Sequence, residues 1–195
     1  MRKQTKPTNS LAKDISYIKD GDNSNLRDIL FKEQKGFCSY TETYLGRTDQ
    51  KDIDHFNPSK EYTERNNYLN LFLCKSQWNK EKSNKWLDFQ PVLSLLNDDF
   101  ENRISYNKEL KLFEAKDEND IEAKHLVKLL KLDDYDLSVE RKKYIDLCKE
   151  LITYYESPTI YFQKITQKNT TELKFIRSLE IEFNIDIWNM IPEPR

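Results

Sequence analysis

The stretch 51–85, KDIDHFNPSKEYTERNNYLNLFLCKSQWNKEKSNK, constrains the fold of this chain more than any other segment. A short run in which apolar and polar residues alternate ends at His55. Pro58 then breaks this strand pattern, because proline has no N–H to donate to the hydrogen bonds between strands. Asn70 opens an apolar run, and a helix-compatible segment that contains Asn79 follows it. The pattern therefore predicts a strand, a loop, a second strand and a helix, in that order.

The polar residues of this stretch resemble the motif of the HNH, or ββα-metal, nucleases. In particular, the stretch resembles the zinc-free HNH domain of the RNA-guided CRISPR nucleases, whose Asp-Val-Asp-His-Ile-x-Pro string is matched in part by residues 52–58. The resemblance implies that Asp54 and Asn79 are metal ligands and that His55 is the general base. It further implies that Asn70 orients the loop after the histidine and that Lys82 contacts a phosphate.

Phosphodiester hydrolysis explains why these residue types are needed. A neutral imidazole, with a reference pKa of about 6.5, can take the proton of an attacking water at physiological pH. A hard divalent ion stabilises the leaving oxygen. Asp54 and Asn79 offer only two oxygen ligands, which suits Mg²⁺ (or Mn²⁺), because Mg²⁺ keeps several waters of its own.

Positive charge that could hold nucleic acid is concentrated in one segment of this chain. Lys and Arg number 32 against 34 Asp and Glu, so the formal net charge is -2 and nucleic acid cannot be held by overall charge. The segment 75–85 is an exception, with four lysines and one glutamate. We therefore expect the nucleic-acid contacts to come from Lys75, Lys80, Lys82 and Lys85.

Three cysteines, Cys38, Cys74 and Cys148, form an odd set without a repeated Cys-x-x-Cys. The first 25 residues have no apolar core of a signal peptide, and no apolar run reaches the roughly 18 residues that span a bilayer. We therefore expect a cytoplasmic protein with no membrane partner.

The predicted fold is α+β. We expect an N-terminal mobile arm with a short helical turn at 1–24, a nuclease core with its leading helix at 25–92, and a hairpin with a helical region packed on the core at 93–195. The expected elements outside the motif are a helix at 26–35 capped by Asn25, a strand at 37–42, a hairpin at 103–113, and helices at 121–131 (capped by Asp120), 137–155 and 171–183.

A second resemblance covers roughly residues 25–150. Leu26-Arg27-x-x-Leu30 and then Gln34-x-Gly36-x-Cys38-x-Tyr40, ahead of the HNH core, resemble the nuclease subunit of the Septu anti-phage system. This likeness implies a defence effector that cuts DNA together with an ATPase partner. Such proteins usually carry two Cys-x-x-Cys pairs that bind zinc, but here Thr41 replaces one cysteine and Cys74 is one residue out of register. A structural zinc is therefore not expected, and the cysteines are better explained as small buried residues.

Other readings of the same residues stay open. His125 is best explained as a helix-face histidine, Trp78 and Trp86 as core residues, and Asp52 as a residue that orients a metal ligand. The chain as a whole is also compatible with a nuclease acting on RNA, with a stand-alone homing or restriction enzyme, or with a catalytically silent interaction subunit of the same fold.

Overall fold

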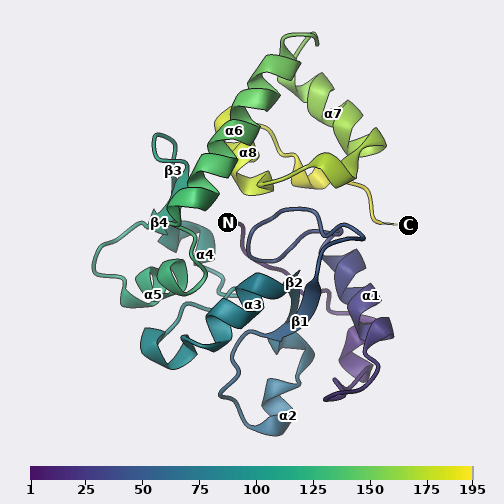
Figure 1. Ribbon diagram of the computed structural model, residues 1–195, viewed down its shortest axis with the longest axis vertical. Helices are drawn as coiled ribbons and strands as arrows, with labels where there is room; N and C mark the ends of the chain where they lie inside the picture. Colours follow the sequence, from purple (N-terminus) through teal and green to yellow (C-terminus); the bar gives the residue numbers. More distant parts are fainter. Residues whose placement is uncertain (195) are drawn as a thin grey trace.

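Eight α-helices and two antiparallel two-stranded sheets give residues 1–194, the part of the chain that the computed structural model describes, an α+β fold (Figure 1). The predicted fold class is thus confirmed. The helices are α1 (Ser24–Glu33), α2 (Tyr62–Arg65), α3 (Ser76–Ser83), α4 (Phe100–Arg103), α5 (Ile121–Leu129), α6 (Tyr135–Ile152), α7 (Pro158–Lys168) and α8 (Ile176–Phe183), and the strands are β1 (Lys51–His55), β2 (Leu71–Lys75), β3 (Ile104–Asn107) and β4 (Leu112–Ala115). None of these helices combines the length and the apolar character that crossing a membrane requires.

The first hairpin and α3 carry the residues of the motif. β1 and β2 run antiparallel, with Asp54 opposite Phe72 and His55 opposite Leu71. β2 is buried from its first residue to Cys74, since α1 and α3 both pack against it. α3 starts directly after β2, at Ser76. The order strand, loop, strand and helix predicted for 51–85 is present.

The apolar residues form two clusters. One joins α1, the first hairpin and α5, and it includes Leu30, Phe72 and Leu126. The other joins α6, α7 and α8 and takes in Phe37 from the loop after α1. Figure 1 shows the three C-terminal helices as a layer at one end of the molecule, with the first hairpin and α3 below them and α2 at the opposite end. The N-terminal segment lies between this layer and the first hairpin.

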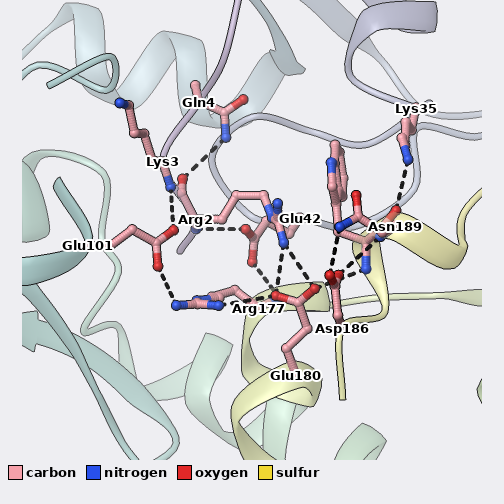
Figure 2. Close-up of polar contacts among 11 residues, drawn as sticks. Arg2, Lys3, Gln4, Lys35, Glu42, Glu101, Arg177, Glu180, Asp186 and Asn189 are labelled. Atoms are coloured by element: carbon pink, nitrogen blue, oxygen red, sulfur yellow. Dashed lines mark hydrogen bonds and ion pairs between the residues drawn. The ribbon is translucent and has the colours of Figure 1, made fainter. Parts of the chain in front are cut away.

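The N-terminal segment is built into this junction (Figure 2) and is not the arm that the sequence predicts. Met1 is only 3% exposed. The backbone N–H of Arg2 donates to Glu42 Oε1 over 2.8 Å, and its guanidinium bonds both carboxylate oxygens of Glu180 on α8 at 2.9 Å. The other oxygen of Glu42 accepts from the backbone N–H of Arg177. The predicted helical turn is present as a 3-10 turn at Leu11–Asp14.

The second hairpin and the two helices that follow it, α5 and α6, agree closely with the prediction. β3 pairs with β4, and the Asp120 side chain caps α5 by accepting from the backbone N–H of Ala123 at 3.0 Å. α6 covers most of the range predicted for its helix. α1 also forms, but it starts at Ser24, so Asn25 lies inside the helix and is not its cap.

One expected element is wrong, and another is shorter than expected. The predicted strand at 37–42 is a tight loop with a single bridge from Phe37 to Tyr44, because Glu42 adopts a left-handed backbone with φ of 54° that no strand accommodates. The helix predicted at 171–183 begins only at Ile176.

α7 was not predicted at all. Pro158 looks like a helix terminator in the sequence, but it occupies the first turn of α7, where a proline lacks only an N–H that would be unpaired anyway. Ser157 caps that turn by accepting from the backbone N–H of Ile160 at 3.3 Å.

Candidate functional site

His55 is the last residue of β1 and lies at the edge of the hairpin. Its ring is half-buried, with Nε2 2.9 Å from Asn66 Oδ1 and with the Tyr17 ring packed edge-on at 4.7 Å. An amide oxygen only accepts, so this contact places the proton on Nε2 and leaves the lone pair on Nδ1. Within residues 1–194 no hydrogen bond occupies Nδ1, which makes this nitrogen the candidate proton acceptor.

The imidazole is kept neutral by its surroundings. Burial lowers the pKa of His55, and this effect outweighs the opposing effects of the hydrogen bond that His55 donates to Asn66 and of the nearby carboxylate of Asp54. A neutral ring at pH 7 is the form that can accept a proton from water.

Asp54 faces the opposite side of β1, against α3. Its carboxylate is 2% exposed, accepts a hydrogen bond from the Tyr40 hydroxyl, and lies 3.2 Å from the ammonium of Lys82. Burial raises the pKa of Asp54, while Lys82 and Tyr40 act in the opposite direction. Asp54 is therefore one half of a buried ion pair.

Lys82 is fully buried, and its predicted phosphate contact is wrong. Nζ donates to the carbonyl oxygens of His55 and Phe56, each at 3.0 Å, in addition to its contact with Asp54. An ammonium has three protons, and these three acceptors use all of them. Lys82 thus ties α3 to the end of β1 and fixes the backbone at the histidine.

The other three predicted phosphate-binding lysines differ in exposure. Lys75 is half-buried and pairs with Asp49 at 3.3 Å. Lys80 and Lys85 are exposed on and after α3, and within the described chain neither forms an ion pair. These two therefore remain the candidates for contact with nucleic acid.

The side chain of Asn79 is held by Asp52. Asn79 Nδ2 donates to Asp52 Oδ2 at 3.1 Å, and the Ser76 hydroxyl donates to the other oxygen of Asp52 at 2.7 Å. The remaining amide oxygen of Asn79 accepts only a long bond, 3.3 Å, from Ser83. The structure thus joins Asn79 to Asp52 and joins Asp54 to Lys82.

A divalent ion shared by Asp54 and Asn79 does not fit this arrangement. The carboxylate of Asp54 is already neutralised by a buried ammonium and is closed to solvent. Among residues 1–194 no group of three or more His, Cys, Asp or Glu side chains is placed to hold a metal. An ion at Asp54 requires Lys82 to move first.

Asn70 organises the histidine loop, which we define as residues 56–70. Its side chain is 5% exposed, accepts from the backbone N–H of Asn57 at 2.9 Å, and donates to the carbonyls of Asn57 and Arg65 at 3.0 and 2.9 Å. Its own carbonyl accepts from Phe56 at 2.8 Å. The two ends of the loop are thereby closed beside His55.

The cysteines are all buried and free within the described residues. Cys38 Sγ accepts from the backbone N–H of Lys75 at 3.4 Å. Burial raises the pKa of the Cys74 thiol well above its usual value, which favours the protonated form.

Sequence reasoning missed two residues of the site. Tyr40 belongs to the Gln-x-Gly-x-Cys-x-Tyr string, which gives no sign of its partner Asp54, 14 positions away. Asn66, the partner of His55, sits in a polar run of the histidine loop that carries no signal of its own.

Comparisons with protein-family models, with curated proteins and with solved structures found no match to this chain.

Proposed function

We propose that this protein is an HNH-type endonuclease that hydrolyses phosphodiester bonds in DNA. The observation that carries the proposal is a neutral, half-exposed His55 whose Nε2 is anchored by Asn66 and whose Nδ1 is free, at the end of the first strand of a strand-strand-helix unit. Further support is the position of Asn70, which closes the loop behind this histidine.

The proposed chemistry starts with a water beside His55. Nδ1 takes a proton from the water as its oxygen forms a new bond to phosphorus, and the bond from phosphorus to the 3′ oxygen breaks. The departing 3′ oxygen takes up a proton from solvent water and leaves as a hydroxyl, and His55 releases the proton it took to solvent. Lys82 acts as a positioning residue, because it fixes the backbone carbonyl of His55. The exposed Lys80 and Lys85 supply positive charge for the DNA backbone.

The resemblance implies Mg²⁺ or Mn²⁺ for the leaving oxygen, whereas Asp54 is closed by Lys82 and Tyr40. Comparison of nicking with the ion and with EDTA measures directly whether cleavage depends on a divalent ion.

The test is nicking of supercoiled plasmid by purified protein with Mg²⁺ or Mn²⁺, and with EDTA as the metal-free arm. We expect wild type to nick and His55→Ala to lose about 10²- to 10⁴-fold in rate, as expected when a general base is removed. The chain has only two histidines, so His125→Ala is the matched control; His125 lies on α5, bonded to the Pro91 carbonyl at 2.9 Å, and we expect full activity. Nicking by His55→Ala at the wild-type rate excludes the mechanism, and preferential cleavage of a structured RNA excludes DNA as the substrate.

A second candidate function is a catalytically silent interaction subunit with the same fold. The closed Asp54–Lys82 pair favours it, because a sealed carboxylate serves stability and needs no metal. Absence of nicking together with absence of Mn²⁺ binding by calorimetry supports this alternative.

We further propose, from the resemblance to the Septu nuclease subunit, that the protein works with an ATPase partner. The modest net charge of -2 suits a subunit that relies on another protein to hold DNA. Co-expression with a candidate ATPase, followed by size-exclusion chromatography, tests this; separate elution at micromolar concentration counts against it.

A further inference from the structure

A cavity of about 550 Å³ lies beside the histidine loop and is lined on its other side by residues between Trp86 and Leu96. The wall on the first side includes Phe56, which directly follows His55. This volume lies within the range of roughly 300–1,000 Å³ that small-molecule sites occupy. None of the groups assigned to proton transfer above lines it.

The floor of the cavity is aromatic and aliphatic. Phe56 packs edge-on against Phe72 and Trp86, with ring centroids 6.1 and 5.5 Å apart. Val92 and Leu96 extend this apolar surface. A flat, weakly hydrated ligand gains most from such a floor.

The rim carries three amide side chains with free groups. Asn57 and Asn67 each use the side-chain oxygen to accept a backbone N–H nearby, at 3.0 and 2.9 Å, and within residues 1–194 their Nδ2 groups have no partner. The Nε2 group of Gln90 donates to the Trp86 carbonyl at 2.7 Å. The side-chain oxygen of Gln90 has no hydrogen-bond partner within residues 1–194. The rim thus offers both donors and an acceptor, which is the pattern needed to read the edge of a nucleobase.

The charge of the cavity fits a neutral group next to an anion. Lys60 and Glu64 line it with opposite charges, so its interior carries no net charge. Lys60 is exposed and forms no ion pair in the described chain, which leaves its ammonium for a phosphate. A nucleobase with its attached phosphate satisfies the floor, the rim and this lysine together.

We propose that this cavity binds one unpaired nucleobase of the DNA strand that is cut at His55, an inference that rests on the proposed nuclease function. Asn67 and Leu69 line this cavity and also a second one of about 440 Å³, which includes Asn66, the partner of His55. Leu69 is 53% exposed and forms the ridge between the two. A strand with one base in the first cavity crosses this ridge towards His55, and the apolar ridge side chain separates adjacent bases.

The test measures binding in EDTA, so that cleavage does not interfere, by fluorescence anisotropy of a labelled single-stranded oligodeoxynucleotide. The comparison probe is an abasic strand of equal length, which keeps the phosphates and lacks the bases. We expect wild type to prefer the strand with bases by about 10-fold, the size of one base-stacking contact.

Two variants locate the preference. Ser94 is exposed and lines the cavity, so Ser94→Trp fills it without disturbing the core and is expected to abolish the preference for bases. Gln90→Ala removes one acceptor and is expected to reduce the preference about threefold. Thr48→Trp, at an exposed turn that lines none of the cavities described here, is the matched control and should behave as wild type.

The outcomes separate this inference from the nuclease proposal. Equal binding of both probes by wild type, or an unchanged preference in Ser94→Trp, overturns the base site even when plasmid nicking depends on His55. If wild type prefers the strand with bases and Ser94→Trp removes this preference, the base site is supported. This holds even when His55→Ala nicks plasmid as fast as wild type, a result that overturns only the nuclease assignment.

Discussion

The ammonium of Lys82 on α3 lies 3.2 Å from the carboxylate of Asp54 on β1, and both side chains are closed to solvent. This pair joins the helix to the strand that carries His55. A buried pair of this kind contributes little net stability compared with apolar residues, but loss of one partner leaves an uncompensated charge.

Replacement of Lys82 by methionine should therefore destabilise the fold by about 3–5 kcal/mol, because Asp54 stays buried without its partner. Urea unfolding at pH 7 measures this. Lys80→Met, on the exposed side of the same helix, should change stability by less than about 0.5 kcal/mol. Asp54→Asn combined with Lys82→Met should recover part of the loss, and a double variant whose losses simply add contradicts the coupling.

The protein should lose stability as the pH falls from 7.5 to 5.5, because His55 is harder to protonate in the folded than in the unfolded state. Burial lowers its pKa in the folded state, whereas the unfolded chain takes up a proton near about 6.5. As pH drops through this value, the unfolded state binds the proton more readily, so folding is disfavoured. Between pH 7.5 and 5.5, wild type should lose more stability in urea than His55→Gln, and equal losses would show that the folded pKa is not lowered.

Asn70→Ala should loosen the histidine loop. The change leaves the backbone N–H of Asn57 and the carbonyls of Asn57 and Arg65 without their partners, which should cost about 2–3 kcal/mol. Limited proteolysis should then cut within 56–70 faster than in wild type. Asn67→Ala, which removes a single exposed turn contact to Leu69, is the control and should cost about 1 kcal/mol or less. Wild-type protease resistance in Asn70→Ala is the result that contradicts this role.

Glu180→Ala should separate the N-terminal segment from α8. The carboxylate of Glu180 accepts hydrogen bonds from the Arg2 guanidinium (Figure 2) and from the backbone N–H of Trp188, each at 2.9 Å. Its loss leaves a largely buried guanidinium without its acceptor, at a cost of about 3 kcal/mol in thermal or urea unfolding. Glu140→Ala, on an exposed position of α6, should be neutral. Amide hydrogen exchange at residues 2–4 should rise only in Glu180→Ala.

Local patterns made much of the fold predictable. The alternation up to His55, the proline after it and the apolar run after Asn70 predict the first hairpin and α3, and the capping aspartate predicts α5. α7 was missed because its first-turn proline resembles a stop signal. The strand predicted at 37–42 does not form, because tertiary contacts hold Glu42 in a left-handed backbone conformation.

The candidate site was predictable only in part. The resemblance implied that Asn70 orients the histidine loop, and the Asn70 side chain does bond the backbone of that loop. The resemblance also implied a phosphate contact for Lys82, whereas the ammonium is buried. A sequence gives the position of a lysine on a helix, but not which of the helix's two sides is covered.

The sequence by itself determined the α+β class, the strand-strand-helix unit and the presence of a histidine at its edge, because these follow from periodicity and from residues close in the chain. Only the tertiary structure decided that Asp54 is closed by Tyr40 and Lys82, that Asn66 anchors His55, and that Arg2 binds Glu180 across 178 positions. Such partners meet when distant segments pack, and the free energy of each contact depends on a burial that no local pattern encodes.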